Sequence, residues 1–111
     1  MTVSEICEAL GGDVQCAGDK GREITGATAG DLLSFIMGTA PEGAAWVTVQ
    51  AHLNVAAVAV LKDLPMIIIA SGRKAPDDLI ERCNTENIAI VSVQDTLYAT
   101  CVKLAGLGLK G

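Results

Sequence analysis

Three short polar segments, residues 50–54, 71–74 and 94–96, contain the side chains that are best suited to bind a ligand. Each segment follows a run of residues that is typical of a β-strand. In open parallel sheets, ligands bind at the carboxyl ends of the strands, so the three segments would share one rim. Their amides, hydroxyls and cations can bind a small molecule or a loop of a partner protein. The predicted ligand-binding residues are Gln50, His52, Asn54, Ser71, Gly72, Arg73, Lys74 and Thr96.

Residues 71–74 form the candidate anion site, because a glycine and two cations stand there shortly before a predicted helix. A helix N-terminus attracts anions through its free N–H groups and its dipole. However, Asp77 and Asp78 occupy the first turn, and two carboxylates repel a phosphate at contact by about 1 kcal/mol even when well solvated. An anion is therefore expected to approach Arg73 and Lys74 from the loop side. No P-loop signature occurs, and neither dinucleotide nor P-loop binding is predicted.

Catalysis would have to use His52, which is the only imidazole of the chain. Ser71 is the conceivable nucleophile and Asp95 the conceivable orienting group, but no G-x-S-x-G elbow or other catalytic signature is present. A histidine at this place more commonly caps or hydrogen-bonds the beginning of its helix. The chain is therefore predicted not to be an enzyme, and a hydrolase or transferase built on His52 and Ser71 is the third functional hypothesis.

The four cysteines, Cys7, Cys16, Cys83 and Cys101, form no C-x-x-C pair, and with a single histidine they complete no usual zinc pattern. The sequence predicts that Cys7, Cys83 and Cys101 are small hydrophobic residues on helix faces. An iron–sulfur or zinc role is the alternative. No metal and no cofactor are therefore predicted.

The length of 111 residues fits one domain, which we place at residues 1–111. The net charge is −5, the aromatic share is 3% and no basic stripe occurs, so the chain is poorly suited to neutralise phosphates or to stack on bases. Nucleic acid is therefore not expected as a partner. The first residues do not read as a signal peptide, and no apolar run reaches the roughly 20 residues of a membrane span. The protein is expected to be cytoplasmic, without contact to a membrane.

Hydrophobic periodicity predicts an α/β fold, with one compact domain that contains a mainly parallel sheet flanked by helices. The continuous aliphatic runs at 66–70 and 88–93 are typical of parallel strands that are buried on both faces. A helix and an edge hairpin of two short strands form a small N-terminal part. The expected helices cover residues 2–10, 31–37, 52–61, 76–87 and 95–106, and the expected strands cover residues 14–17, 24–27, 44–49, 66–70 and 88–93.

Several residues carry signals for the beginnings and ends of these helices. Thr2 and Glu5 form a capping-box pattern. Gly38 is expected to stop the helix at 31–37, and Asn87 is a plausible left-handed stop of the helix that begins at Pro76. Asp95 is expected to cap the last helix, after which the tail is expected to be loose at its end.

The helix predicted at residues 52–61, with the sequence HLNVAAVAVL, is apolar almost all round. A surface helix would expose some of these aliphatic side chains to water, so this helix must be covered on two sides. The sheet can cover one side, and a second copy of the protein is a natural cover for the other. We therefore expect a homodimer through helix 52–61. The alternative is a helix that is buried wholly inside the monomer.

Residues 21–107 resemble the DRTGG domain in its short, free-standing form. The likeness lies in the order of the elements, which includes a strand that ends in a TGG-like turn, a proline-led helix, and a final strand and helix. Ser-Gly-Arg at residues 71–73 stands where the family has Thr-Gly-Gly. Ala-His at residues 51–52 stands where the family has Asp-Arg, and Asn54 stands where another aspartate is usual.

The resemblance implies an α/β domain that is commonly dimeric and has no established catalytic activity. Such domains occur as regulatory inserts beside CBS domain pairs in some pyrophosphatases. The first functional hypothesis is therefore a non-catalytic regulatory or adaptor domain, homodimeric, that binds a partner protein or a small metabolite at the strand-end loops. The second hypothesis is an adenine-nucleotide or anion sensor that uses residues 71–74.

Overall fold

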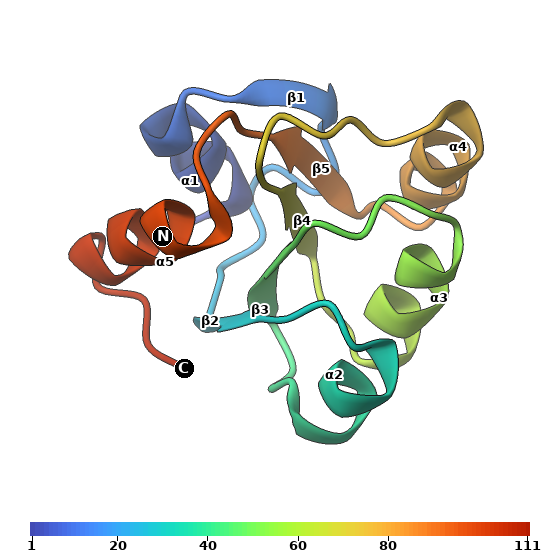
Figure 1. The fold of residues 1–111 in the computed structure, drawn as a ribbon, viewed down its shortest axis with the longest axis horizontal. Coiled ribbons are helices and arrows are strands. Elements are labelled where there is room, and N and C mark those ends of the chain that lie inside the picture. Colours follow the sequence, from blue (N-terminus) through green and yellow to red (C-terminus); the bar gives the residue numbers. More distant parts are fainter.

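The aliphatic runs of the sequence form the buried centre of a five-stranded sheet. The computed structural model describes residues 1–111, and its strands are ordered β1-β5-β4-β3-β2 (Figure 1). The four strands β2 to β5 are parallel, and β1 runs antiparallel to β5. Every residue of β3, β4 and β5 is buried, as expected for strands with both faces covered. The strands are β1 Asp13–Cys16, β2 Gly26–Ala29, β3 Ala44–Thr48, β4 Met66–Ile69 and β5 Ala89–Ser92.

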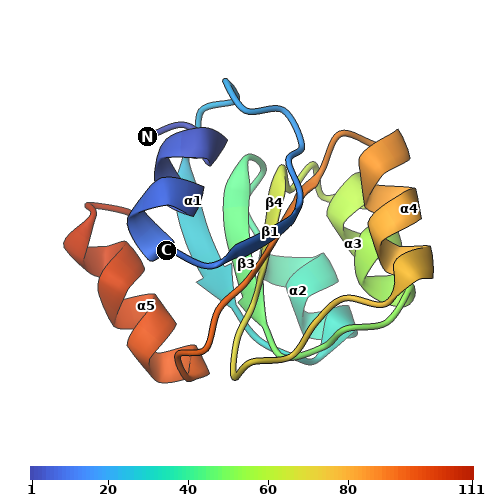
Figure 2. The ribbon, with the colours of Figure 1, turned by 90° about the horizontal axis from the view of Figure 1, so that it is seen from above.

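Two layers of helices cover the two faces of this sheet. In Figures 1 and 2, α1 and α5 lie on one side, and α2, α3 and α4 lie on the other. The predicted α/β fold with a mainly parallel sheet is therefore confirmed. None of these helices is both long enough and apolar enough to cross a membrane. The helices are α1 Val3–Leu10, α2 Leu33–Thr39, α3 Asn54–Leu61, α4 Asp77–Thr85 and α5 Leu97–Gly106.

Alternate strand residues supply two separate hydrophobic clusters, because successive side chains of a strand point to opposite faces. Trp46 and Ile67 belong to the cluster under α2, α3 and α4. Val47 and Ile68, their neighbours in the chain, belong to the cluster under α1 and α5. Each face of the sheet therefore has its own core, which explains why the central strands are apolar at every position.

The predicted capping box at Thr2 and Glu5 and the predicted left-handed stop at Asn87 are confirmed. The Thr2 hydroxyl accepts a hydrogen bond from Glu5 N at 3.2 Å, and Thr2 N donates to Glu5 Oε1 at 2.8 Å. The bond from the Thr2 backbone lowers the pKa of Glu5. Gly11 ends α1 with φ 65°, and Asn87 follows α4 with φ 57°. Both therefore take the left-handed conformation that commonly stops a helix.

The expected hairpin of two N-terminal strands was wrong, since β1 and β2 form opposite edges of the sheet. The segment between them crosses the amino ends of the central strands instead. Its backbone passes so close to β5 that a Cβ at Gly18 would lie 2.4 Å from Ala89 N. Arg22 donates two hydrogen bonds to the carboxylate of Asp63, at 2.8 and 3.3 Å. These contacts hold the polar segment across the sheet, where the sequence suggested a tight turn.

Three other local predictions were wrong. Gly38 lies inside α2 and does not stop it. The hydroxyl of Thr96, which accepts from Ala99 N, caps α5, whereas Asp95 forms an ion pair with Lys103 at 2.6 Å. The tail is anchored rather than loose, because Ala27 N in β2 donates a hydrogen bond to its Lys110 carbonyl.

The four thiols are free, and Cys7, Cys83 and Cys101 lie on helices against the hydrophobic clusters, as the sequence predicted. Cys83 is fully buried in the larger cluster, where desolvation raises its pKa to about 12. Cys7 and Cys101 are half-buried against the smaller cluster, and Cys16 is buried in β1. No group of three or more His, Cys, Asp or Glu side chains is placed to share a metal ion.

Candidate functional site

The carboxyl ends of the four parallel strands lie at one end of the molecule, which faces the viewer in Figure 1. We call this end the rim. The connections that follow β3, β4 and β5 contain Gln50, Ser71 and Gln94, so the fold brings the three predicted polar segments to the same end. Two of these connections are bonded directly, because Ser71 N donates to the Asp95 carbonyl at 2.7 Å.

Ser71 and Gly72 form a tight turn whose N–H groups are already used. Both residues are left-handed, with φ 62° and 72°, and Arg73 N donates to the Ala70 carbonyl to close the turn. Besides the bond of Ser71, Gly72 N donates to the Val93 carbonyl at 2.8 Å. The turn therefore joins β4 to the segment after β5, and its two N–H groups are not free to bind a phosphate.

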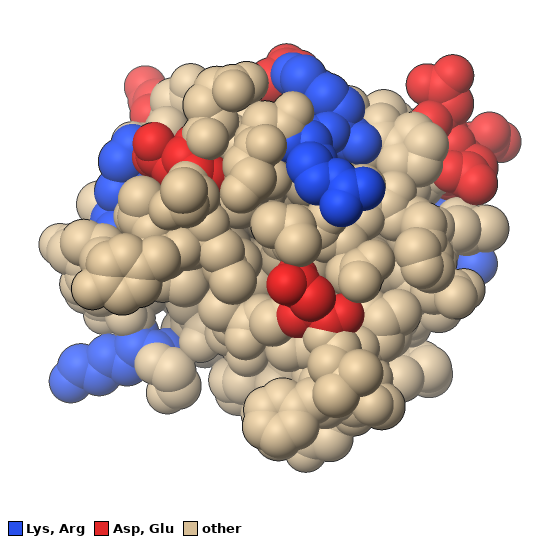
Figure 3. Space-filling view, viewed as in Figure 1, with Lys and Arg blue, Asp and Glu red and all other residues tan.

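The two cations of this loop differ in their surroundings. Lys74 is half-exposed and forms an ion pair with Asp13 of β1 at 2.6 Å. Arg73 is exposed and its guanidinium has no ion-pair partner. The basic atoms at the top of Figure 3 gather over the β4–α4 connection, which contains both residues. An anion at this loop would therefore meet one free cation and one neutralised cation.

Of the predicted residues after β3, Gln50 and His52 lie in the connection to α3, and Asn54 is the first residue of that helix. Asn54 N approaches His52 Nδ1 at 3.4 Å, so the imidazole bonds the start of its helix as the sequence suggested. Gln50 is half-buried, and its N–H donates to the Thr48 hydroxyl at 3.0 Å. No hydrogen bond joins His52 to Ser71. The predicted ligand residue Thr96 uses its hydroxyl to cap α5.

The structure adds two features to the rim that the sequence analysis missed. Asp31, which follows β2, accepts hydrogen bonds from the Thr48 hydroxyl and from Val49 N, each at 2.8 Å. Leu32 and Phe35, beside it, are 67% and 63% exposed. The sequence analysis expected residues 31–37 to form a helix and did not single out Leu32, which the structure places at the N-cap position of α2.

Figure 3 shows the rim end with few charged atoms over α2 and α3. One acidic group lies near the centre, over the β2–α2 connection that contains Asp31. The surface around it is uncharged in Figure 3. Three exposed apolar residues belong to the beginnings of α2 and α3, namely Leu32, Phe35 and Leu53. The rim therefore has a basic part over the β4–α4 connection and an apolar part over the beginnings of α2 and α3.

None of the four described cavities is lined by Gln50, His52 or Ser71. A cavity of about 340 Å³ lies where β1 meets the rim, and two ion pairs line it. Its lysines are therefore already matched by aspartates. The two pairs are Lys74 with Asp13 and Lys103 with Asp95.

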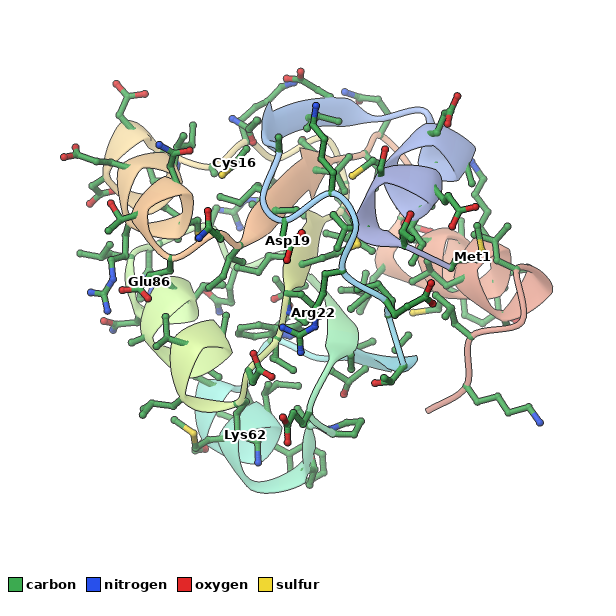
Figure 4. The ribbon with its side chains drawn as sticks, turned by 180° about the vertical axis from the view of Figure 1, so that it is seen from behind. Met1, Cys16, Asp19, Arg22, Lys62 and Glu86 are labelled. Carbon is green, nitrogen blue, oxygen red and sulfur yellow. The ribbon has the colours of Figure 1, made fainter.

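A smaller cavity of about 180 Å³ lies at the opposite end of the molecule and contains Arg22 and Asp63. Figure 4 shows Arg22 near the centre of that end, with Asp19 close by and Glu86 on a neighbouring segment. The hydrogen bonds from Arg22 lower the pKa of Asp63, and they raise the pKa of Arg22 itself. This end is thus occupied by a structural ion pair.

Residues 106–111 match the G-x-G-x-x-G pattern of dinucleotide-binding loops. However, they lie at the C-terminal end of α5. A dinucleotide loop requires this pattern between a strand and the N-terminus of a helix, where the dipole attracts the pyrophosphate. Here the pattern follows a helix and leads along β2. It therefore gives no support to dinucleotide binding.

No family model matches the sequence, and no curated protein matches it. The fold is similar to a crystal structure of the CBS and DRTGG domains of the regulatory region of Clostridium perfringens pyrophosphatase, which is complexed with its activator diadenosine tetraphosphate. The TM-score is 0.74 at 13% sequence identity, over 98% of this chain and 47% of that chain. The chain thus spans about half the length of that structure. The protein shares its fold with part of this regulatory region, in agreement with the resemblance to the DRTGG domain.

Proposed function

We propose that this protein is a non-catalytic regulatory or adaptor domain that binds a partner protein at its rim. The observation that carries the proposal is the rim patch, which consists of the exposed side chains of Leu32, Phe35 and Leu53. Leu32 and Leu53 are the N-cap residues of α2 and α3, so both stand at the strand-end edge of the molecule. Clustered exposed apolar side chains with a polar border are typical of protein interaction sites.

The polar residues of the rim suit a protein partner better than a small molecule. Small-molecule sites are concave and bury most of their ligand, whereas no described cavity is lined by Gln50, His52 or Ser71. The N–H groups of Ser71 and Gly72 donate to backbone carbonyls. Gln50, His52, Asn54 and Arg73 would instead form the polar border of an interface centred on the rim patch.

We further propose that the domain forms a homodimer through α3, over a narrower surface than the sequence suggested. Neighbouring helices α2 and α4 contact α3, and Val55, Ala56, Val58 and Ala59 are buried inside the monomer. The apolar residues of α3 that remain exposed, Ala57 and Leu61, are spaced by four and lie on one stripe of the helix. Sedimentation of the wild type and of Leu61→Glu tests this: a dimer that the substitution dissociates supports it, and a strictly monomeric wild type at micromolar concentration contradicts it.

The partner-binding proposal can be tested with a substitution that removes the patch without weakening the fold. Leu32→Asp introduces an acidic N-cap where the present N-cap has no side-chain hydrogen bond, so we expect α2 to be stabilised by about 1 kcal/mol. Partner binding should be lost, because a charge replaces an exposed apolar side chain. Affinity capture with wild type, Leu32→Asp and Phe35→Ser should identify a protein that only the wild type retains.

Tyr98→Ser provides the matched control, because Tyr98 is an exposed aromatic residue on α5. It removes a similar apolar area from another surface, so capture of the same protein should persist. If all variants capture the same proteins, or if only the control loses them, the rim patch is not the binding surface. Urea unfolding of each variant separates a lost interaction from a lost fold.

Adenine nucleotides are the second candidate, because the structurally similar regulatory region is complexed with diadenosine tetraphosphate as its activator. The free guanidinium of Arg73 is the group that would meet a phosphate. Calorimetric titration with diadenosine tetraphosphate and with ATP tests this candidate. Heat that disappears in Arg73→Ala supports a nucleotide sensor, and an absence of binding at millimolar concentration contradicts it.

A further inference from the structure

The outer edge of β1 is not paired with any other part of the chain. β1 is an edge strand whose only neighbour in the sheet is β5. Apart from this pairing, no backbone N–H or carbonyl of residues 13–16 takes part in a hydrogen bond. Figures 1 and 2 show no ribbon beyond this strand. Alternate backbone groups of an edge strand point outward, so β1 offers donors and acceptors to an added strand.

Side-chain contacts hold this edge in place on the side of α4. The amide of Gln15 donates to the Ala75 carbonyl at 3.3 Å and accepts from Ala75 N at 2.9 Å. Asp13 binds the ammonium of Lys74 at 2.6 Å. An added strand would therefore meet an edge that is already ordered, which lowers the entropic cost of binding.

A groove of about 550 Å³ runs beside this edge, between β1 and α1. Val14, which is 47% exposed, pairs with Val91, and Val91 belongs to the cluster under α1 and α5. Val14 therefore points to the α1 side, where it lines the groove with Cys7 and Ala17. Side chains of a strand added to β1 would point alternately into this groove and away from it.

The charges around the groove indicate the chemistry of the occupant. Residues 1–20 contain four carboxylates and one lysine, and the groove itself is lined by Glu8 and Lys20. Of these carboxylates, Asp13 is paired with Lys74 and Asp19 lies in the cavity that contains Arg22. Glu5 and Glu8 of α1, the helix that lines the groove, therefore remain as the acidic groups beside it, with Lys20 as the one cation. A second copy of the chain would bring the same acidic excess and a net charge of −5. A basic segment is therefore favoured over a second copy.

We propose that the β1 edge binds an extended segment of a partner protein as a sixth strand, with apolar side chains in the groove and basic residues beside them. Main-chain hydrogen bonds to β1 would supply affinity, and the groove between α1 and β1 would select the side chains. This surface lies on the edge of the sheet, away from the rim patch. Its occupant and the partner of the rim can therefore be tested independently.

The test uses the full chain and a blocked hexapeptide, Lys-Thr-Val-Thr-Val-Lys, whose two valines lie on the same face of an extended strand. Titration followed by amide resonances should shift the signals of residues 13–16 and of α1. An analogue N-methylated at both threonines and both valines loses its central donors on both edges, and its methyl groups block the close approach of another strand, so it should not bind. A peptide with glutamates in place of the lysines should bind about tenfold weaker.

Val14→Lys should abolish binding of the basic peptide, because it puts a cation into the groove at an exposed position that carries little of the fold. Val102→Lys is the matched control, an exposed valine on α5, and should bind as the wild type does. The proposal is overturned if Val14→Lys binds normally, if the N-methylated analogue binds equally, or if the shifts fall elsewhere. A dimer that Val14→Lys dissociates would show that a second copy occupies the edge.

Discussion

The chain covers one edge of the sheet, at β2, and leaves the other edge, at β1, uncovered. At the β2 edge, Ala27 N donates to the Lys110 carbonyl, and Leu109 is half-buried beside it. Gly26 permits this approach, because a Cβ there would lie 2.5 Å from the Lys110 carbonyl oxygen. At the β1 edge, no segment of the chain pairs with the outer backbone groups.

This difference shows which edge is available to a partner. Uncovered strand edges promote unwanted association, so proteins usually cover, shorten or charge them. Here the parallel edge is covered by the tail, whereas the antiparallel edge is short and carries Asp13. The β1 edge is therefore protected mainly by its short length, because the Asp13 carboxylate is already paired with Lys74.

The largest expected effect comes from detaching β1 from β5. In Gly12→Ala, the new methyl group would lie 2.5 Å from the Ser92 carbonyl oxygen and within 2.9 Å of two valine side chains. We expect the free energy of unfolding to fall by about 3 kcal/mol. Gly11→Ala is the control, because nothing lies within 4 Å and only its left-handed φ of 65° opposes a side chain, which costs about 1 kcal/mol. Equal losses in urea unfolding would contradict the close approach at Gly12.

The next effect concerns the covered edge. Gly26→Ala should displace the tail and break the bond from Ala27 to Lys110, with a loss of about 1 kcal/mol. Amide exchange at Ala27 should become faster, and the β2 edge should then resemble the β1 edge. Gly38→Ala is the control inside α2, where nothing lies within 4 Å, and it should stabilise the protein by about 0.5 kcal/mol. Unchanged exchange at Ala27 would show that the tail does not protect this edge.

The smallest effect concerns the segment that connects the two edges. The bonds from Arg22 lower the pKa of Asp63 below its ordinary value of 3.8 in the folded protein only. Their stabilisation is therefore present above this value and is lost as the pH falls through the lower, folded pKa. Because both side chains are substantially exposed, Arg22→Ala should cost at most about 1 kcal/mol at neutral pH. Wild type and variant should converge in stability in acid, and a constant difference between them would contradict this assignment.

The sequence predicts the centre of the fold well because the signals there are local. The continuous apolar runs of β4 and β5 identify strands that are buried on both faces, and Thr2 and Glu5 identify a helix start by their own hydrogen bonds. The edges depend on contacts between distant residues. Nothing in the segment between β1 and β2 specifies that Arg22 meets Asp63, so a polar turn was the natural interpretation.

The rim could be predicted only in part for a similar reason. The order of strands and loops in the sequence was sufficient to predict that Gln50 and Ser71 lie at the same end of the sheet. It could not show that the N–H groups of Ser71 and Gly72 would be used by carbonyls after β5, because this depends on the register of neighbouring strands. The apolar part was missed because Leu32 matches the helical spacing of the buried residues, although it lies just before the helix.

The turn at Ser71 and Gly72 has a mechanical consequence for any partner at the rim. Its bonds to the carbonyls of Val93 and Asp95 continue the pairing of β4 and β5 beyond the strands, up to the residue before the cap of α5. The two loops are thus joined to each other by backbone hydrogen bonds. A force applied to either loop would be transmitted to the start of α5, on the opposite face from α3 and α4. This turn therefore offers a route by which contact at the rim can reach both layers of helices.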